Sequence, residues 1–385
     1  MLVLALIISL ILAFVSIWRY KKVFNPFTIE AYFTILFMIV PQLFIINSSS
    51  DGGLYFYSDL VIIIYVVCIF VGTLININSF KIKPIEHAGA INIFNVLLYV
   101  ALIGPLMPFL LSKGISARGF REFYETVVFT KYASFYELSK LVLYFIIFFK
   151  LVKQQKFSRG FFILFPLVFF YGSRFVILDC IIYLCVYLEQ FKHLSVRRII
   201  SVCVVGAAAI GGYTYLQFSS ENISTLLVSY FDIYKNQSKL INMLMNGDVD
   251  YFNGEIYFSS YLKFIPRILW ENKPKQFGFA IINYTIFPYE AARGYMPSFG
   301  LGVTFADFGF ISIIWTGLFN GFLRNFFYRI FIKSKNNLSF FLFIFPFAMI
   351  TNLFLLLYLV VDFSLTKWFR KHDKSASPEL NMSNE

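Results

Sequence analysis

The chain opens with the stretch MLVLALIISLILAFVSIW, residues 1–18, which contains no charged side chain. The basic residues Arg19, Lys21 and Lys22 follow it directly. An apolar run of this length is long enough to cross a bilayer, and positive charge behind it is typical of the cytoplasmic side. A cleavable signal peptide has its positive charge in front of the apolar run. We therefore predict an uncleaved first span with the N-terminus outside.

The composition of the whole chain agrees with this start. Of 385 residues, 59% are hydrophobic and only 14% are charged, whereas a soluble domain carries about 25% charged residues. An ordinary soluble enzyme, a disordered chain and a disulfide scaffold are therefore excluded. The four cysteines all lie in apolar runs without Cys-x-x-Cys spacing, which is typical of buried structural thiols. They are Cys68, Cys180, Cys185 and Cys203.

Further apolar runs predict an all-α polytopic membrane protein with about 11 transmembrane helices, within a range of about 10–12. Two long runs, 161–189 and 338–368, each allow one helix or a hairpin of two. The hairpins leave the basic clusters inside, so the positive-inside rule favours them. The predicted spans after the first are 28–46, 57–77, 91–111, 138–152, 161–172, 175–189, 199–216, 299–322, 338–352 and 353–368.

These spans divide the chain into four parts. Residues 1–216 form a bundle of about 8 spans, and residues 217–298 form a large periplasmic loop. Residues 299–368 form about 3 further spans, and residues 369–385 form a polar cytoplasmic tail. The net charge of +12 is spread in short clusters between apolar runs. This pattern sets membrane orientation, so we expect no nucleic-acid partner.

The large loop is too long to be a simple connection, because structureless loops beyond about 15 residues are usually functional or disordered. Within it, Ile233–Met245 has the spacing of a helix. The three histidines, which are His87, His193 and His372, all map to cytoplasmic segments. A reaction at the outer face would therefore need a carboxylate as its general base, and no metal site is expected there.

Arg174 is the first candidate for a binding residue. It lies in Gly172-Ser173-Arg174, between two apolar runs. An arginine near the bilayer centre costs about 2.5–3.5 kcal/mol on insertion scales, so it faces a cavity, a partner or the headgroups. Arg174 is therefore either an anion ligand that lines a cavity or a side chain that reaches the outer headgroups.

Cations are the second candidate feature, because five of them lie in the last part of the large loop. Guanidinium groups match phosphate oxygens in pairs, so several at one membrane surface suit a lipid diphosphate. The alternative is that they bind anionic headgroups or pair with the interleaved Glu255, Glu271 and Glu290. The five are Lys263, Arg267, Lys273, Lys275 and Arg293.

Three short patterns remain. Asp307, in Asp307-Phe308-Gly309 near the outer end of span 299–322, is an intramembrane acid and hence a site candidate. Asp248-Val249-Asp250 resembles the metal motif of nucleotide-sugar glycosyltransferases, but it follows Asn246-Gly247 and so favours a solvated turn. Gly317-x-x-x-Gly321 is a pattern of closely packed membrane helices.

Four features together resemble the bacterial O-antigen polymerases, which are Wzy-type polymerases of oligosaccharide repeat units. One is the layout of many spans with a dominant outer loop before the last ones. Another is Arg159-Gly160, followed by an apolar run and Gly172-Ser173-Arg174. The other two are FIPRILWENKPKQFG at 264–278 and MPSFGLGVTFADFGFISI at 296–313. Good motif agreement covers 262–321 and the Gly-Ser-Arg hairpin.

The resemblance implies a metal-independent glycosyltransferase in the bacterial inner membrane, with its N-terminus periplasmic and its C-terminus cytoplasmic. It would transfer the growing glycan from undecaprenyl diphosphate to the non-reducing end of a new lipid-linked repeat unit. Undecaprenyl-diphosphate-linked oligosaccharides would be donor and acceptor, and no cofactor is implied. Its further partners would be membrane lipid and, in the same pathway, a chain-length regulator and a flippase.

This chemistry suggests roles for the candidates. A departing diphosphate needs cations, which we assign to Arg174, Arg267 and Arg293, with Lys273 and Lys275 as secondary contacts. The acceptor hydroxyl must lose a proton, for which Glu255 is the first candidate base and Asp307 the second.

Three alternatives stay open from the sequence. The O-antigen ligase shares the layout, but its proposed mechanism uses a histidine in the large outer loop, where this chain has none. A lipid-linked oligosaccharide flippase or transporter typically has two related helix halves and short loops. A glycosyltransferase that uses a polyprenyl-phosphate sugar usually has acids in the first outer loop, where this chain offers Asp51 and Asp59.

Overall fold

The computed structural model describes most of the chain. The continuous ranges are 1–45, 55–75, 93–127, 132–147, 152–153, 156–157, 165–171, 174–192, 232–262, 276–292, 297–334 and 337–346. Isolated positions are also described at 197, 200–201, 204–205, 208, 211–212, 215–216, 265, 270, 274 and 360–361.

The described part is helical apart from one short antiparallel pair, β1 (Val152–Lys153) and β2 (Lys156–Phe157). The first helices are α1 (Leu2–Tyr20), α2 (Thr28–Thr34), a π-helical turn (Ile35–Ile39), α3 (Val40–Ile45) and α4 (Phe56–Leu74). Next come α5 (Ile93–Ile103), a 3₁₀ turn (Gly104–Leu106), α6 (Met107–Lys113), α7 (Ala117–Val127), α8 (Ala133–Phe145), a 3₁₀ helix (Phe165–Tyr171) and α10 (Arg174–Lys192). The last are α13 (Asp232–Asn246), α14 (Glu255–Leu262), α15 (Phe279–Ile286), α16 (Pro288–Ala292), α17 (Gly302–Phe308), α18 (Phe310–Ser334) and α19 (Asn337–Ile344).

The helices follow most of the predicted apolar runs. Among the described residues, three helices are long and apolar enough to cross a membrane: Leu2–Tyr20, Phe56–Leu74 and Phe94–Lys113. The total of about 11 spans therefore stays a prediction. The predicted break after 161–172 agrees with a 3₁₀ helix that ends at Tyr171 and an α10 that begins at Arg174. The predicted helix in the large loop is confirmed as α13.

The predicted span 299–322 is wrong in its boundaries. The helix breaks at Gly309, whose φ of 61° lies in the left-handed region that glycine adopts without strain. The break leaves α17 as a short helix, and α18 then continues to Ser334, well beyond the predicted end. Hydrophobicity does not fall at Gly309, so the apolar pattern could not show the break, and the polar Arg324 and Asn325 that follow the predicted end lie within α18. As a consequence, Asp307 belongs to α17 and not to the long helix.

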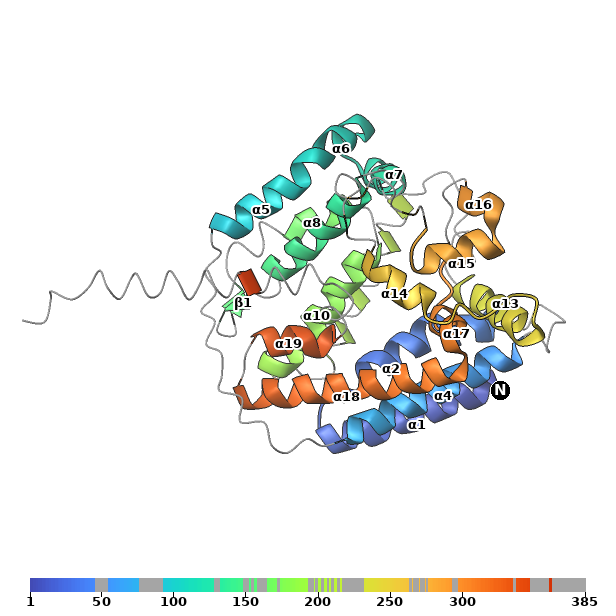
Figure 1. The fold of residues 1–385 in the computed structure, drawn as a ribbon. Coiled ribbons are helices and arrows are strands. Elements are labelled where there is room, and N and C mark those ends of the chain that lie inside the picture. Colours follow the sequence, from blue (N-terminus) through green and yellow to red (C-terminus); the bar gives the residue numbers. More distant parts are fainter. Residues whose placement is uncertain are drawn as a thin grey trace, which may run out of the picture.

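The helices α1, α4 and α18 run side by side in the same direction (Figure 1). The hydroxyl of Tyr20, in the last turn of α1, donates to Asn325 of α18 at 3.0 Å. The Asn325 amide donates to the carbonyl of Ile75, just after α4, at 3.1 Å. The predicted topology also gives these three spans one direction, from outside to inside. We therefore call the end with Leu2, Phe56 and Phe310 the outer end.

Glycines let α4 and α18 approach to backbone contact. A Cβ added to Gly321 would clash with the carbonyl oxygen of Ile69, and one added to Gly72 would clash with that of Leu318. A Cβ on Gly317 would lie 2.8 Å from the Cβ of Cys68. The pair Gly317 and Gly321 is therefore a packing motif, as the spacing predicted.

We expect Gly321→Leu to lower the stability of the helix pair by about 1–3 kcal/mol or more, because the two backbones must separate. The yield of monodisperse protein in detergent and its thermal unfolding midpoint measure the effect. Gly104→Ala is the matched control, since nothing lies within 4 Å of an added Cβ there. Equal stability of the Gly321→Leu and Gly104→Ala variants would contradict the packing role.

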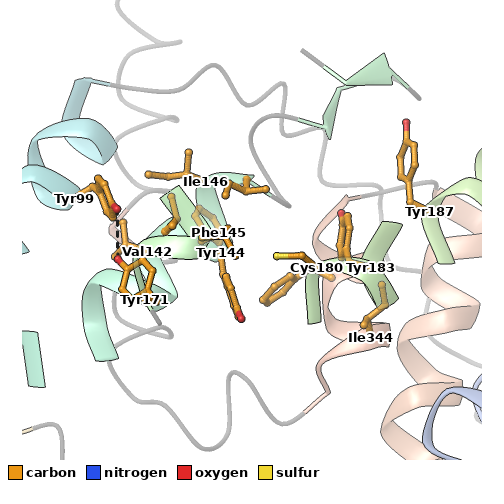
Figure 2. Close-up of a cluster of buried hydrophobic side chains, with 14 of the residues drawn as sticks. Tyr99, Val142, Tyr144, Phe145, Ile146, Tyr171, Cys180, Tyr183, Tyr187 and Ile344 are labelled. Carbon is orange, nitrogen blue, oxygen red and sulfur yellow. Dashed lines mark hydrogen bonds between the residues drawn. The ribbon is translucent and has the colours of Figure 1, made fainter. Parts of the chain in front are cut away.

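A second packed region joins α5, α8, α10, α19 and the 3₁₀ helix 165–171. Figure 2 shows its centre, where buried aromatic and aliphatic side chains from these elements meet. Tyr171 links three of the elements, because its hydroxyl donates to Ser139 at 3.0 Å and lies 3.4 Å from the Tyr99 hydroxyl. The Tyr136 hydroxyl donates to the Tyr171 carbonyl at 2.5 Å. These bonds hold the end of the 3₁₀ helix, directly before the Gly-Ser-Arg hairpin.

Arg324 forms a buried ion pair between α18 and α2. Its guanidinium lies 2.7 Å from a carboxylate oxygen of Glu30 and donates to the Asn320 side chain at 3.0 Å. It also donates to the carbonyls of Phe343 at 3.3 Å and Ile344 at 2.9 Å, at the end of α19. One largely buried side chain, 7% exposed, thus joins three helices.

Candidate functional site

The described part of the large loop forms a compact unit at the outer end. Its helices α13, α14, α15 and α16 lie with α17 at the end where the chain starts (Figure 1). Two polar contacts fix α13 on the first turn of α4. The Tyr234 hydroxyl donates to the Asp59 carboxylate, and the Gln237 amide donates to the Ser58 hydroxyl at 2.8 Å. Gln237 also accepts from the Leu301 amide at 2.9 Å. The loop is therefore anchored on the bundle.

The anchoring tyrosine keeps its proton. Burial, followed by the hydrogen bond to Asp59, raises the pKa of the Tyr234 phenol above its ordinary value. The hydroxyl is thus a donor at neutral pH, and the contact does not change its protonation in the physiological range. Tyr234 also stacks on Tyr55, with ring centroids 5.5 Å apart. The pair holds α13 and gives no group for proton transfer.

Asp307 is bound by backbone amides. One of its carboxylate oxygens accepts from the amides of Gly254 and Ile256, each at 3.1 Å, and the other accepts from the amide of Tyr257 at 2.9 Å. The backbone carbonyl of Asp307 also accepts from the Asn253 amide at 3.0 Å. The side chain is 5% exposed. Asp307 therefore fixes the start of α14, where the free amides of a helix need an acceptor.

Glu255 is the first residue of α14 and is exposed. Its amide donates to the Phe252 carbonyl at 2.9 Å, and its neighbours on both sides donate their amides to Asp307. The position of its Cα is therefore fixed by Asp307, whereas its carboxylate reaches solvent. Of the two predicted base candidates, the structure leaves Glu255 accessible and surrounds Asp307 with donors.

The segment that carries Arg267, Lys273 and Lys275, together with Lys263, starts at the end of α14 and returns to contact it. It leaves α14 after Leu262 and returns at Gly278, whose amide donates to the Ser259 hydroxyl at 2.8 Å. Gly278 has a φ of 55°, and a Cβ there would lie 2.5 Å from the Ser260 hydroxyl. The return is therefore a close backbone contact. The cations Arg267, Lys273 and Lys275 themselves lie outside the described residues.

The other two predicted cations are placed only in part. Arg293 lies outside the described residues, between α16, which ends at Ala292, and Pro297. The carbonyl of Pro297 accepts from the Asn283 amide of α15 at 3.3 Å. Arg174 is the first residue of α10, but its side chain is outside the described part. The structure thus unites Glu255 and Asp307 and leaves the cation cluster as a prediction.

Metal ligation finds no support within the described ranges. No group of three or more histidine, cysteine, aspartate or glutamate side chains there is arranged to hold a metal ion. The pair Asp248 and Asp250 flanks a turn after α13, where Gly247 has a φ of 78°. Both aspartates are exposed. This geometry agrees with the solvated turn that the sequence favoured.

The buried polar contacts of the bundle are only weakly indicated by the sequence. Glu30 lies in the predicted span 28–46. An acid within a membrane span indicates a partner of opposite charge. Arg324 follows the predicted end of span 299–322, so the apolar pattern alone gives it a cytoplasmic position. Asp59 was noted only as an acid in the first outer loop. Its partner Tyr234 lies too far away along the chain to be paired with it by spacing.

Comparison with known proteins finds two curated relatives, the O-antigen polymerases of Salmonella typhimurium and Salmonella typhi. Each is 26% identical over 189 residues, which are 46% of this chain and 45% of the relative. The chain therefore spans about half the length of the curated relatives that it matches. No family model matches, and no solved structure matches significantly. The resemblance that the motifs predicted is confirmed, and the apolar helices agree with a membrane protein.

Proposed function

We propose that this protein polymerises lipid-linked oligosaccharide repeat units of O-antigen or a related surface polysaccharide at the periplasmic face of the bacterial inner membrane. The similarity to two O-antigen polymerases supports this activity. One structural observation carries the proposed site. A single short helix, α14, begins with an accessible carboxylate and anchors both ends of the segment that bears four cations, Arg267, Lys273 and Lys275 among them.

The reaction transfers a glycan between two carriers. A hydroxyl oxygen at the non-reducing end of the new repeat unit attacks the anomeric carbon of the growing glycan. A new glycosidic bond forms, and the bond from that carbon to the diphosphate of undecaprenyl diphosphate breaks with its electron pair. The hydroxyl proton passes to a carboxylate. Atoms and charge balance without a metal or a nucleotide.

The cations stabilise the leaving group. Negative charge on the diphosphate grows as the glycosidic bond to it breaks, so nearby guanidinium and ammonium groups lower the barrier. We assign this role to Arg174, Arg267 and Arg293, with Lys273 and Lys275 as further contacts. Arginine suits the task because its planar fork binds two phosphate oxygens together.

The proton is taken by Glu255. Its carboxylate is exposed at the start of α14, and the absence of histidine from the predicted outer segments leaves carboxylates for this work. Asp307 acts as a positioning residue, because its carboxylate already accepts three backbone hydrogen bonds. The residue is also only 5% exposed, so a substrate hydroxyl does not reach it as it can reach Glu255.

The test is a gel of surface polysaccharide from a deletion strain, complemented with variants. The deletion is expected to reduce the ladder to core with a single repeat unit. Complementation with Arg267→Ala or Arg174→Ala, at normal protein levels, is expected to leave short chains. Arg118→Ala is the matched control, because Arg118 is an exposed arginine of α7 whose described ion pair is with Glu122 of the same helix.

Other results would contradict the proposal or indicate a different function. Full-length chains from the Arg267 and Arg174 variants would refute the diphosphate role. A deletion strain whose core carries no repeat unit would refute polymerisation. Polymer on undecaprenyl diphosphate outside the membrane would then indicate a ligase, and single units retained inside would indicate a flippase.

A further inference from the structure

A row of exposed apolar side chains runs from α18 onto the large loop. On α18, Ile311 is 75% exposed and Trp315 is 68% exposed. Beyond the break at Gly309, Phe308 is 50% exposed, and Phe258 of α14 is 67% exposed. Tyr257 on the same helix is also exposed. Such a row in contact with water would be unusual, because soluble surfaces rarely expose contiguous large apolar patches.

The row is continuous across the junction of the two elements. Ring atoms of Phe258 and Phe308 both lie 3.0 Å from the position that a Cβ on Gly254 would take. The two rings are therefore neighbours above the same glycine. Ile311 and Trp315 follow on successive turns of α18, and the Trp315 ring stacks on Phe319 at 6.0 Å between centroids. The exposed face of α14 thus continues onto Phe308 of α17, which directly precedes α18, and the exposed Ile311 and Trp315 of α18 lie in the predicted span 299–322.

The position of this row along the bundle can be judged from α1. Trp18 is exposed near the inner end of α1 and is followed by Arg19, which is typical of a membrane boundary. The hydrocarbon core is about 30 Å thick, or about 20 helical residues. Leu2 lies 16 residues outward from Trp18, or about 24 Å along α1, so the hydrocarbon core reaches past the level of Leu2. The Leu2 amide donates to Asp59, in the first turn of α4.

That level is also the level of α13 and α17. Asp59 accepts from Tyr234 of α13, and α13 packs against α17, which carries Asp307 and Phe308. The hydrocarbon therefore extends outward as far as the elements that hold α14. An apolar row at this height meets the outer leaflet and not bulk water.

We propose that α14 is an interfacial helix, whose face with Phe258 lies among the acyl chains of the outer leaflet. The opposite side of α14 packs against the rest of the protein, since Ile256 is buried and Ser259 accepts from the Gly278 amide. Tyr257 then lies at the headgroup boundary, where tyrosine is enriched. The lipid surface is the occupant that continuity with α18 indicates, whereas a second copy of the chain would need a separate interface.

This placement sets the height of the proposed site. Glu255 begins α14, and the cationic segment leaves α14 after Leu262 and returns to it at Gly278, so they would lie at the level of lipid phosphates. A substrate carried on a polyprenyl diphosphate would meet them without leaving the bilayer. This last step rests on the proposed function, but the insertion of α14 does not.

Depth-dependent fluorescence quenching tests the insertion. The full chain, with its four native cysteines replaced and its unfolding midpoint checked, carries one bimane label at a time in phospholipid nanodiscs. Phe258→Cys and Tyr257→Cys report on α14. Ile311→Cys is the membrane reference, and Asp248→Cys, on the exposed turn after α13, is the aqueous reference. Nitroxide on the upper acyl chain and iodide in water are the two quenchers.

The label at 258 is expected to behave like the one at 311, with several-fold stronger quenching by lipid nitroxide than at 248 and weak quenching by iodide. The label at 257 should respond to both quenchers. Quenching at 258 like that at 248 would overturn the proposal. Protection from both quenchers, together with cross-linking between copies at 258, would also overturn it in favour of self-association. If the label at 258 shows insertion into the lipid but the unlabelled wild-type chain forms no polymer, only the proposed function is refuted.

Discussion

Arg324→Leu is expected to remove most of the folded protein from the membrane. The substitution leaves the Glu30 carboxylate buried without its cation, and it leaves the carbonyls at the end of α19 without their donor. Removing one partner of a buried ion pair costs about 3–5 kcal/mol, which is a large share of a stability of about 5–15 kcal/mol. The measurement is the amount of monodisperse full-length protein and its thermal unfolding midpoint.

The expected loss follows from the whole network. Glu30 also accepts from the Tyr65 hydroxyl at 3.1 Å, and Tyr65 accepts from the Asn320 amide at 3.1 Å. Four helices, α2, α4, α18 and α19, are therefore joined by one set of bonds. Because a charge is costly in this environment, the network is stable only when every member has its partner.

Two variants separate this explanation from a loss of packing. Arg324→Lys keeps the charge but cannot reach Glu30, Asn320 and two carbonyls together, so we expect intermediate stability. The double variant Glu30→Leu with Arg324→Leu removes both charges and should be more stable than Arg324→Leu alone. If the double variant were as unstable as the sum of both single variants, the charge argument would be wrong.

Apolar runs predicted where helices lie but not where one of them breaks. Around Asp307 the chain reads LGVTFADFGFISI, residues 301–313, in which hydrophobicity continues through the break. The break at Gly309 depends on its positive φ and on the packing of Tyr251 against it, at 3.4 Å from an added Cβ. These are tertiary effects, so a window of hydropathy averages over them. The same averaging ended the predicted span too early and placed Arg324 in a loop.

The sequence predicted which kinds of side chain belong to the candidate site, but not the role of each one. Asp307 was selected because an acid inside an apolar run needs a partner. The sequence made it a site candidate and the second candidate base, whereas its partners in the structure are the backbone amides of residues 254, 256 and 257. Backbone amides leave no trace in a residue pattern, so a capping role could not be told from a catalytic one. Glu255 was selected from the lack of histidine, and its accessible position supports that choice.

Glu255→Gln is expected to lower the rate of polymerisation about 10²–10⁴-fold without affecting folding, because general bases contribute factors of this size. The amide keeps the shape of the carboxylate but cannot accept the hydroxyl proton. The side chain is exposed, and the hydrogen bond from the Glu255 backbone amide to the Phe252 carbonyl does not involve the carboxylate. The thermal unfolding midpoint should therefore equal that of the wild type. The rate is measured with purified protein and lipid-linked repeat units, and the ladder on gels gives the result in cells.

Two comparisons make this prediction specific to Glu255. Glu290→Gln, at an exposed glutamate of α16 in the same loop, should leave both rate and stability unchanged. Asp307→Asn should lower stability together with rate, because an amide nitrogen would face one of the backbone donors of α14. A rate that falls only with the unfolding midpoint indicates positioning, and a rate that falls alone indicates proton transfer. Normal chain lengths from Glu255→Gln would show that Glu255 is not the base. Full activity of Asp307→Asn at reduced stability would show that the reaction does not need Asp307 to fix the start of α14.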